Sequence, residues 1–81
     1  MNKDQQIFLY MLYFALLEIR ASDDLNTCRI IADVFHNVPI RLIAGVDEAE
    51  IMDGMLKTSE RVGLSESFIE DLKDNATRRS S

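Results

Sequence analysis

The sequence predicts an all-α protein: a small antiparallel helical bundle of three longer helices and a short fourth, with the first helix at its centre. Three observations lead to this fold class. Only one proline and three glycines interrupt 81 residues, and no run of alternating β-branched residues indicates a strand. The turn signals leave connections of about three residues after the first and third helices, and such short connections make consecutive helices antiparallel neighbours.

The first predicted helix contains the most apolar stretch of the chain, residues 7–19, in which Glu18 is the only charge. Asn2 or Asp4 can cap its start, and Gln5 stands three residues after Asn2, in the spacing of a capping box. Apolar side chains occur all around this helix, so no polar face is left for water. We therefore expect the helix to be enclosed by the rest of the chain or by a partner.

Two sets of side chains on this helix are assigned different roles. Leu12 and Leu16 lie on the side assigned to the core, and replacing either by alanine should cost about 2–5 kcal/mol of stability. Tyr10, Tyr13 and Leu17 lie round the back and are the candidate partner-binding residues, since tyrosine is an amphipathic anchor at interfaces. If the other helices leave this side uncovered, a second copy can cover it through a two-fold interface.

The second helix is predicted from about Asp24 to about Asn37. Residues 22–24, Ser-Asp-Asp, favour a turn and an N-cap. Pro39 ends the helix because the residue before a proline is pushed out of the α region. A short helical turn, closed by Gly45, is expected to follow and to pack over the end of the bundle. The inner stripe is predicted to be Leu25, Cys28, Ile31, Ala32 and Phe35, widened by Ile30 and Val34.

The third and fourth helices begin at capping signals. Asp47 precedes the third helix with Glu50 in capping-box spacing, and Gly63 supplies its C-terminal stop. Ser65 caps the fourth helix, which is expected to end near Asn75. The inward side chains are predicted to be Ala49, Met52, Met55, Leu56 and Val62 on the third helix, and Phe68, Ile69 and Leu72 on the fourth.

Length and composition exclude several classes of function. The chain makes one domain, residues 1–76, followed by a polar tail at residues 77–81 that is expected to fray. A net charge of −5 argues against nucleic acid or an anionic membrane as the partner, because both attract an excess of Lys and Arg. Residues 7–19 are too short to span a bilayer, which needs about 20 apolar residues. Cys28 is the only cysteine and cannot form an internal disulfide, so we expect a cytoplasmic protein.

One weak constellation is left for metal or catalytic chemistry. Asp33 and His36 share a face of the second helix at i, i+3 spacing, and antiparallel packing can bring Glu18 near them. A di-iron bundle needs paired Glu-x-x-His motifs, whereas this chain has one histidine and no such motif. The simpler interpretation is a structural ion-pair cluster with Arg29 beside Asp33. We predict no catalytic residues, no metal and no cofactor, and keep these three residues as weak metal candidates.

The second half of the chain is strongly acidic. Residues 47–76 contain nine Asp and Glu but only three Lys and Arg. The simplest interpretation is a solvated face helped by pairs such as Asp53–Lys57. The alternative is a surface for a basic partner, with Glu48, Glu50 and Asp53 as the candidate contacts.

These observations predict a small acidic protein-interaction module without enzymatic activity, working as a homodimer. The first alternative is an immunity or inhibitor-type protein that binds a basic partner through residues 47–76, a likeness of composition only. The second alternative is a metal-binding helical bundle. The expected partner is a second copy or another protein, not nucleic acid or a membrane.

Overall fold

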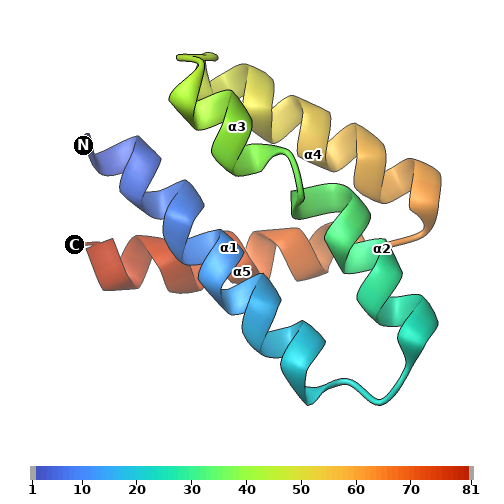
Figure 1. Ribbon diagram of the computed structural model, residues 1–81. Helices are drawn as coiled ribbons and strands as arrows, with labels where there is room; N and C mark the ends of the chain where they lie inside the picture. The colour runs from blue at the N-terminus through green and yellow to red at the C-terminus, as the bar shows by residue number, and fades with distance from the viewer. Residues whose placement is uncertain (1, 81) are drawn as a thin grey trace.

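The computed structural model describes residues 2–80, and within them it contains only helices and the turns that join them (Figure 1). The helices are α1 (Lys3–Ala21), α2 (Leu25–Phe35), α3 (Val38–Ile43), α4 (Glu48–Val62) and α5 (Glu66–Ser80). The all-α prediction is confirmed, and the short α3 begins beside Pro39, where a helical turn is predicted. Met1 and Ser81, the ends of the predicted domain and tail, lie outside the described residues.

The bundle is arranged around α1, which packs against α2, α3 and α5. Its most extensive contact is with α5, which passes behind it in Figure 1. α4 closes the bundle by packing against α2, α3 and α5. The helix predicted to be central thus packs mainly against α2, α3 and α5.

Local capping chemistry sets the helix ends. The Asn2 side chain accepts a hydrogen bond from the backbone N–H of Gln5 at 2.8 Å, and the Gln5 side chain accepts one from the N–H of Asn2 at 3.2 Å, which completes the predicted capping box. Asp47 accepts a hydrogen bond from the N–H of Ala49 at 3.2 Å. Gly63 ends α4 with a φ of 88°, in the left-handed region that favours glycine. Such signals act over a few residues, so the sequence suffices to predict them.

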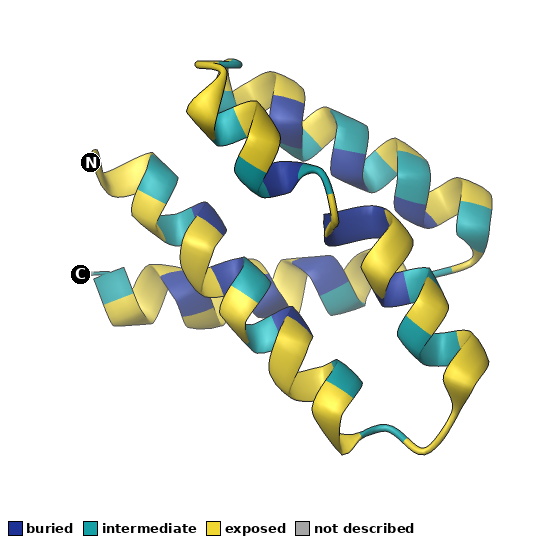
Figure 2. Cartoon of the chain, viewed as in Figure 1, coloured by how far each residue is buried: buried dark blue, intermediate teal, exposed yellow. Residues whose placement is uncertain are grey.

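The core lies where the inward faces of the helices meet, shown in dark blue in Figure 2. Its most enclosed side chains include Met11 and Ala15 of α1 and Ile69 and Ala76 of α5, all 0% exposed. Removing this apolar surface from water is the main favourable term in folding. The complete set of buried hydrophobic residues is Phe8, Met11, Ala15, Ile31, Val34, Phe35, Val38, Ile51, Met55, Ile69, Leu72 and Ala76.

Several predicted core positions are wrong. Leu16 and Leu25 are 55% and 64% exposed, and Ala32 and Ala49 are exposed as well. Leu12 is half-buried and packs against the core. On a helix that is apolar all round, periodicity cannot indicate which face turns inward, because every face fits the pattern. Leu25 is the first residue of α2, at the edge of the bundle.

The last helix, α5, is longer than the sequence predicts. It continues past Asn75 to Ser80, so residues 77–80 of the predicted frayed tail are helical. Ala76 is fully buried and ties this part of α5 to the core. No helix breaker follows Asn75, and two arginines in the last turn interact favourably with the negative end of the helix dipole.

Candidate functional site

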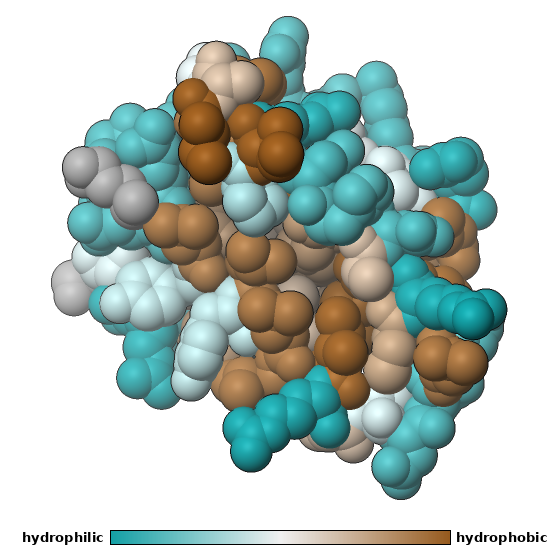
Figure 3. All heavy atoms as spheres, viewed as in Figure 1, coloured by the Kyte–Doolittle hydropathy of each residue, from teal (hydrophilic) through white to brown (hydrophobic). Residues whose placement is uncertain are grey.

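The outer face of α1 is the main apolar surface of the molecule. We call it the outer α1 face and define it by Leu9, Tyr10, Tyr13, Leu16 and Leu17. These side chains are 37% to 55% exposed, and none of them is charged. Figure 3 shows hydrophobic side chains gathered along α1 and on the neighbouring end of α3. The three partner-binding candidates of α1 therefore all belong to one exposed patch, and such patches are typical of interaction sites.

The ring of Tyr13 is held by its neighbour in the chain. It meets the ring of Phe14 edge-on, with 5.3 Å between the ring centroids and an angle of 62° between the planes. Phe14 is itself partly buried against the core. An aromatic side chain that is already positioned loses little conformational entropy when a partner covers it. The ring of Tyr13 therefore has a defined position at the middle of the outer α1 face.

A groove of about 490 Å³ borders the outer α1 face where α1 passes α3. Gln5 and Leu9 of α1 form one wall, and Pro39, Leu42 and Ile43 of α3 form the other. Ile43 is 87% exposed, although the sequence predicts its segment to be a connection packed over the end of the bundle. The groove extends the apolar surface of α1 onto α3. Sequence reasoning missed it because it depends on the relative position of two helices.

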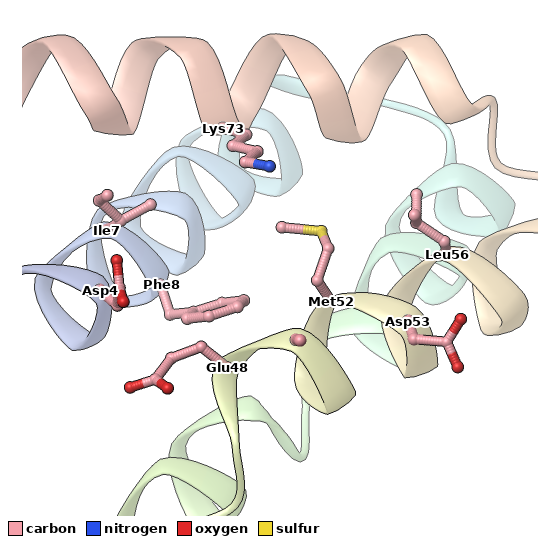
Figure 4. Close-up of a pocket in the computed structure, with 9 residues that line it drawn as sticks. Asp4, Ile7, Phe8, Glu48, Met52, Asp53, Leu56 and Lys73 are labelled. Carbon is pink, nitrogen blue, oxygen red and sulfur yellow. The ribbon is translucent and has the colours of Figure 1, made fainter.

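A second groove, of about 460 Å³, lies between α1, α4 and α5 (Figure 4). We call it the acidic groove because Asp4, Glu48 and Asp53 line it, with Lys73 as its only base. Figure 4 shows the Phe8 ring between α1 and α4, near the middle of the groove. The remaining lining residues are apolar: Ile7, Phe8, Ala49, Met52 and Leu56.

The three acidic contacts predicted from the sequence have different surroundings. Glu48 is half-buried, whereas Asp53 is exposed and forms the predicted i, i+4 ion pair with Lys57 at 3.0 Å. Glu50 is exposed and is not among the residues that line the acidic groove. The start of α4 is capped by the side chain of Asp47, and Glu50 does not complete a capping box there. The structure therefore brings two of the three acids to one groove.

The weak metal candidates Glu18, Asp33 and His36 do not converge. In the described part of the chain, no three His, Cys, Asp or Glu side chains are placed to hold a metal ion. His36 is exposed, and its Nδ1 lies 2.9 Å from the backbone carbonyl oxygen of Asp33, to which a protonated Nδ1 donates. The predicted ion pair between Arg29 and Asp33 is not formed. The ion pair found in the described part of the chain joins Asp53 and Lys57. The ring of His36 thus contacts backbone carbonyl groups in the last turn of α2.

Among the described residues, the start of α2 holds the one carboxyl group whose pKa is clearly shifted. The side chain of Asp24 accepts a hydrogen bond from the hydroxyl of Thr27 at 2.6 Å and another from the backbone N–H of Asn26 at 3.1 Å. The Thr27 bond is the larger cause, and together the two bonds lower the pKa of Asp24 below its ordinary value. Both bonds favour the ionised form. Asp24 is therefore a structural N-cap and not an acid–base group.

Comparisons with protein-family models, with curated proteins and with solved structures found no match to this chain. Within residues 2–80, none of the helices has both the length and the apolar character that a bilayer crossing requires. The case for a function therefore rests on the surfaces described above.

Proposed function

We propose that this chain is a protein-interaction module without enzymatic activity, and that it works as a cytoplasmic homodimer through the outer α1 face. The observation that supports this proposal is that five large side chains of the central helix are left uncovered. Removing apolar surface from water contributes a favourable free energy of about 25 cal/mol per Å². A second copy carries the same face, so one two-fold contact covers both. The lone Cys28 supports the proposed compartment, since it has no disulfide to form within the chain.

The distribution of charge supports contact between copies at this face. With a net charge of −5, two copies repel one another over much of their surfaces. The outer α1 face carries no charged side chain, so its two copies can meet without placing like charges together. A chain of this size buries only about 60% of its unfolded surface and gains stability from covering more.

Sedimentation equilibrium tests the proposal. The parent protein, 9.3 kDa per chain, is expected to sediment with twice that mass at micromolar concentration. Leu16→Glu should give a monomer because it places a charge inside the contact. Leu25→Glu is the matched control: it also changes an exposed leucine on a helix and adds the same charge, but it lies outside the face and should stay dimeric. A parent that sediments as a single chain at every concentration contradicts the proposal.

A second candidate function is the binding of a basic protein, in the manner of an immunity or inhibitor protein. It is favoured by the acidic groove, which combines an apolar floor with three carboxylates. Glu48→Lys should slow association with a basic partner recovered by pull-down, most strongly at low salt. Glu70→Lys, an exposed charge reversal outside the groove, is the control. Equal effects of the two variants, or binding that is independent of ionic strength, contradict this candidate.

The metal-binding alternative is not proposed, because Glu18, Asp33 and His36 do not form a site in the described residues. Neither proposed function uses these three side chains.

A further inference from the structure

We propose that the two copies meet with their α1 helices antiparallel and with Tyr13 of each copy beside the two-fold axis. This geometry rests on the proposed function and specifies how the second copy sits on the outer α1 face. Three features carry it: the outline of that face, the polar residues at its two ends, and the groove beside α3.

The outer α1 face is centred on Tyr13. Its other members lie three or four residues away on either side: Leu9, Tyr10, Leu16 and Leu17. Seven residues away the same side of the helix becomes polar, with Gln6 at one end and Arg20 at the other, both exposed. The apolar part therefore extends about 12 Å, at 1.5 Å per residue. In a two-fold contact the residue at the centre meets its own copy, and here that residue is Tyr13, 52% exposed.

The ends of the face distinguish the two possible orientations of the second helix. In a parallel pair, Arg20 of one copy lies beside Arg20 of the other, and like ends of the helix dipoles are adjacent. In an antiparallel pair, Arg20 lies beside Gln6 of the second copy, whose side-chain oxygen accepts a hydrogen bond from the guanidinium. Opposite ends of the two helix dipoles are then adjacent as well. Charge and dipole therefore both favour the antiparallel orientation.

The antiparallel pair also fills the groove beside α3. The two-fold axis stands perpendicular to both helices, so Leu9 and Leu16 of both copies lie on the same side of the contact. Leu16 of the second copy thus arrives beside Leu9, at the mouth of the groove that Leu42 and Ile43 line on the α3 side. Leu16 is the most exposed member of the outer α1 face. Each copy supplies one leucine and one groove.

The distribution of exposed hydrophobic side chains agrees with this arrangement. A stable interface of standard size buries roughly 800 Å² per partner, which is about 15% of the 5311 Å² surface of one copy. Among the described residues, every exposed large hydrophobic side chain except Leu25 lies on α1 or α3. The exposed large hydrophobic side chains are thus concentrated on the two helices that the second copy contacts in this arrangement.

Cysteine cross-linking in a Cys28→Ser background tests the geometry. Serine keeps the hydrogen bond that the Cys28 side chain donates to the carbonyl oxygen of Ile19. Under mild oxidation, Tyr13→Cys should form a linked dimer, since a disulfide requires Cα atoms within about 7 Å. A mixture of Leu9→Cys and Leu16→Cys chains should link, whereas Leu9→Cys alone should not. Asp71→Cys, exposed on α5, should stay unlinked as the control.

The outcomes separate this geometry from the proposed function. If the parent sediments as a dimer but Leu9→Cys links to itself, or Tyr13→Cys does not link, the antiparallel geometry is overturned and the homodimer stands. If the parent sediments as a monomer, both fall. For the groove, Leu16→Ala should raise the dimer Kd about tenfold or more, and Leu25→Ala less than about twofold. Equal effects of these two leucines overturn the placement of Leu16.

Discussion

The inner and outer faces of α1 have similar composition and opposite surroundings. On the inner face, Phe8, Met11 and Ala15 are at most 4% exposed, whereas Leu9 and Leu16 on the outer face are 37% and 55% exposed. Residue type therefore does not decide burial on this helix; the positions of α2, α3 and α5 decide it. The core does not enclose the apolar side chains of the outer α1 face. These exposed side chains are the feature that suggests a partner.

The largest expected difference between the faces is in stability. Met11→Ala should cost about 2–5 kcal/mol because it leaves a cavity where the side chain is fully enclosed. Leu16→Ala, measured where the protein is monomeric, should change the free energy of unfolding by no more than about 0.5 kcal/mol. This replaces the sequence-based expectation for Leu16, and the half-buried Leu12 should lie between the two. Urea unfolding at unchanged m-value measures all three. Equal losses of unfolding free energy in Met11→Ala and Leu16→Ala would contradict the distinction between the inner and outer faces of α1.

The outer face should instead control how stability depends on concentration. Association with a second copy stabilises the folded chain by about 2.7 kcal/mol at a hundredfold excess over Kd. The Tm of the parent should therefore rise with protein concentration, whereas the Tm of Leu16→Glu should not. Calorimetry over a range of concentrations measures this. A Tm that is independent of concentration in the parent would assign the outer face no role in association.

Much of the fold could be predicted because its signals are local. The Asn2–Gln5 capping box, the Asp47 cap and the Gly63 stop each involve residues close together in the chain. The phase of α1 could not be predicted, because all its faces are apolar. The length of α5 was missed for a related reason: Ala76 looks neutral in a polar segment, yet tertiary contact buries it completely.

The candidate site, like the fold, could be predicted from the sequence only in part. The exposure of Tyr10, Tyr13 and Leu17 could be predicted because apolar residues continue around α1 beyond what three neighbouring helices can cover. The exposure of Leu9, Leu16 and Ile43 was not predicted. Which side of α1 stays uncovered depends on where α3 and α5 pack, and no short-range pattern records that.

A smaller effect is expected at the start of α4, away from both faces of α1. Asp47→Ala removes the acceptor for the N–H of Ala49 and should cost about 1 kcal/mol. Asp47→Asn keeps an acceptor oxygen and should cost less. Chemical denaturation measures both, and the dimer Kd of each folded variant should match that of the parent. A changed Kd would mean that the contact extends to α4.

The smallest effect concerns the pH dependence of stability at the start of α2. The pKa of Asp24 is lowered in the folded chain, chiefly by the hydroxyl of Thr27. Its stabilisation is therefore present above the ordinary pKa of 3.8 and is lost as the pH falls through the lower folded value. Asp24→Asn should flatten that part of the stability profile, measured by urea midpoints between about pH 5 and pH 3. An unchanged slope would contradict the role of Asp24.

The protruding Ile43 side chain and the neighbouring outer α1 face bear on the fate of newly made chains. If the proposed dimer forms, a chain that has not yet associated exposes its leucines and tyrosines, and exposed apolar surface is what chaperones and proteases recognise. Monomeric chains should therefore be degraded faster than dimeric chains. We expect the steady-state amount in a cell to drop more than proportionally when synthesis is reduced.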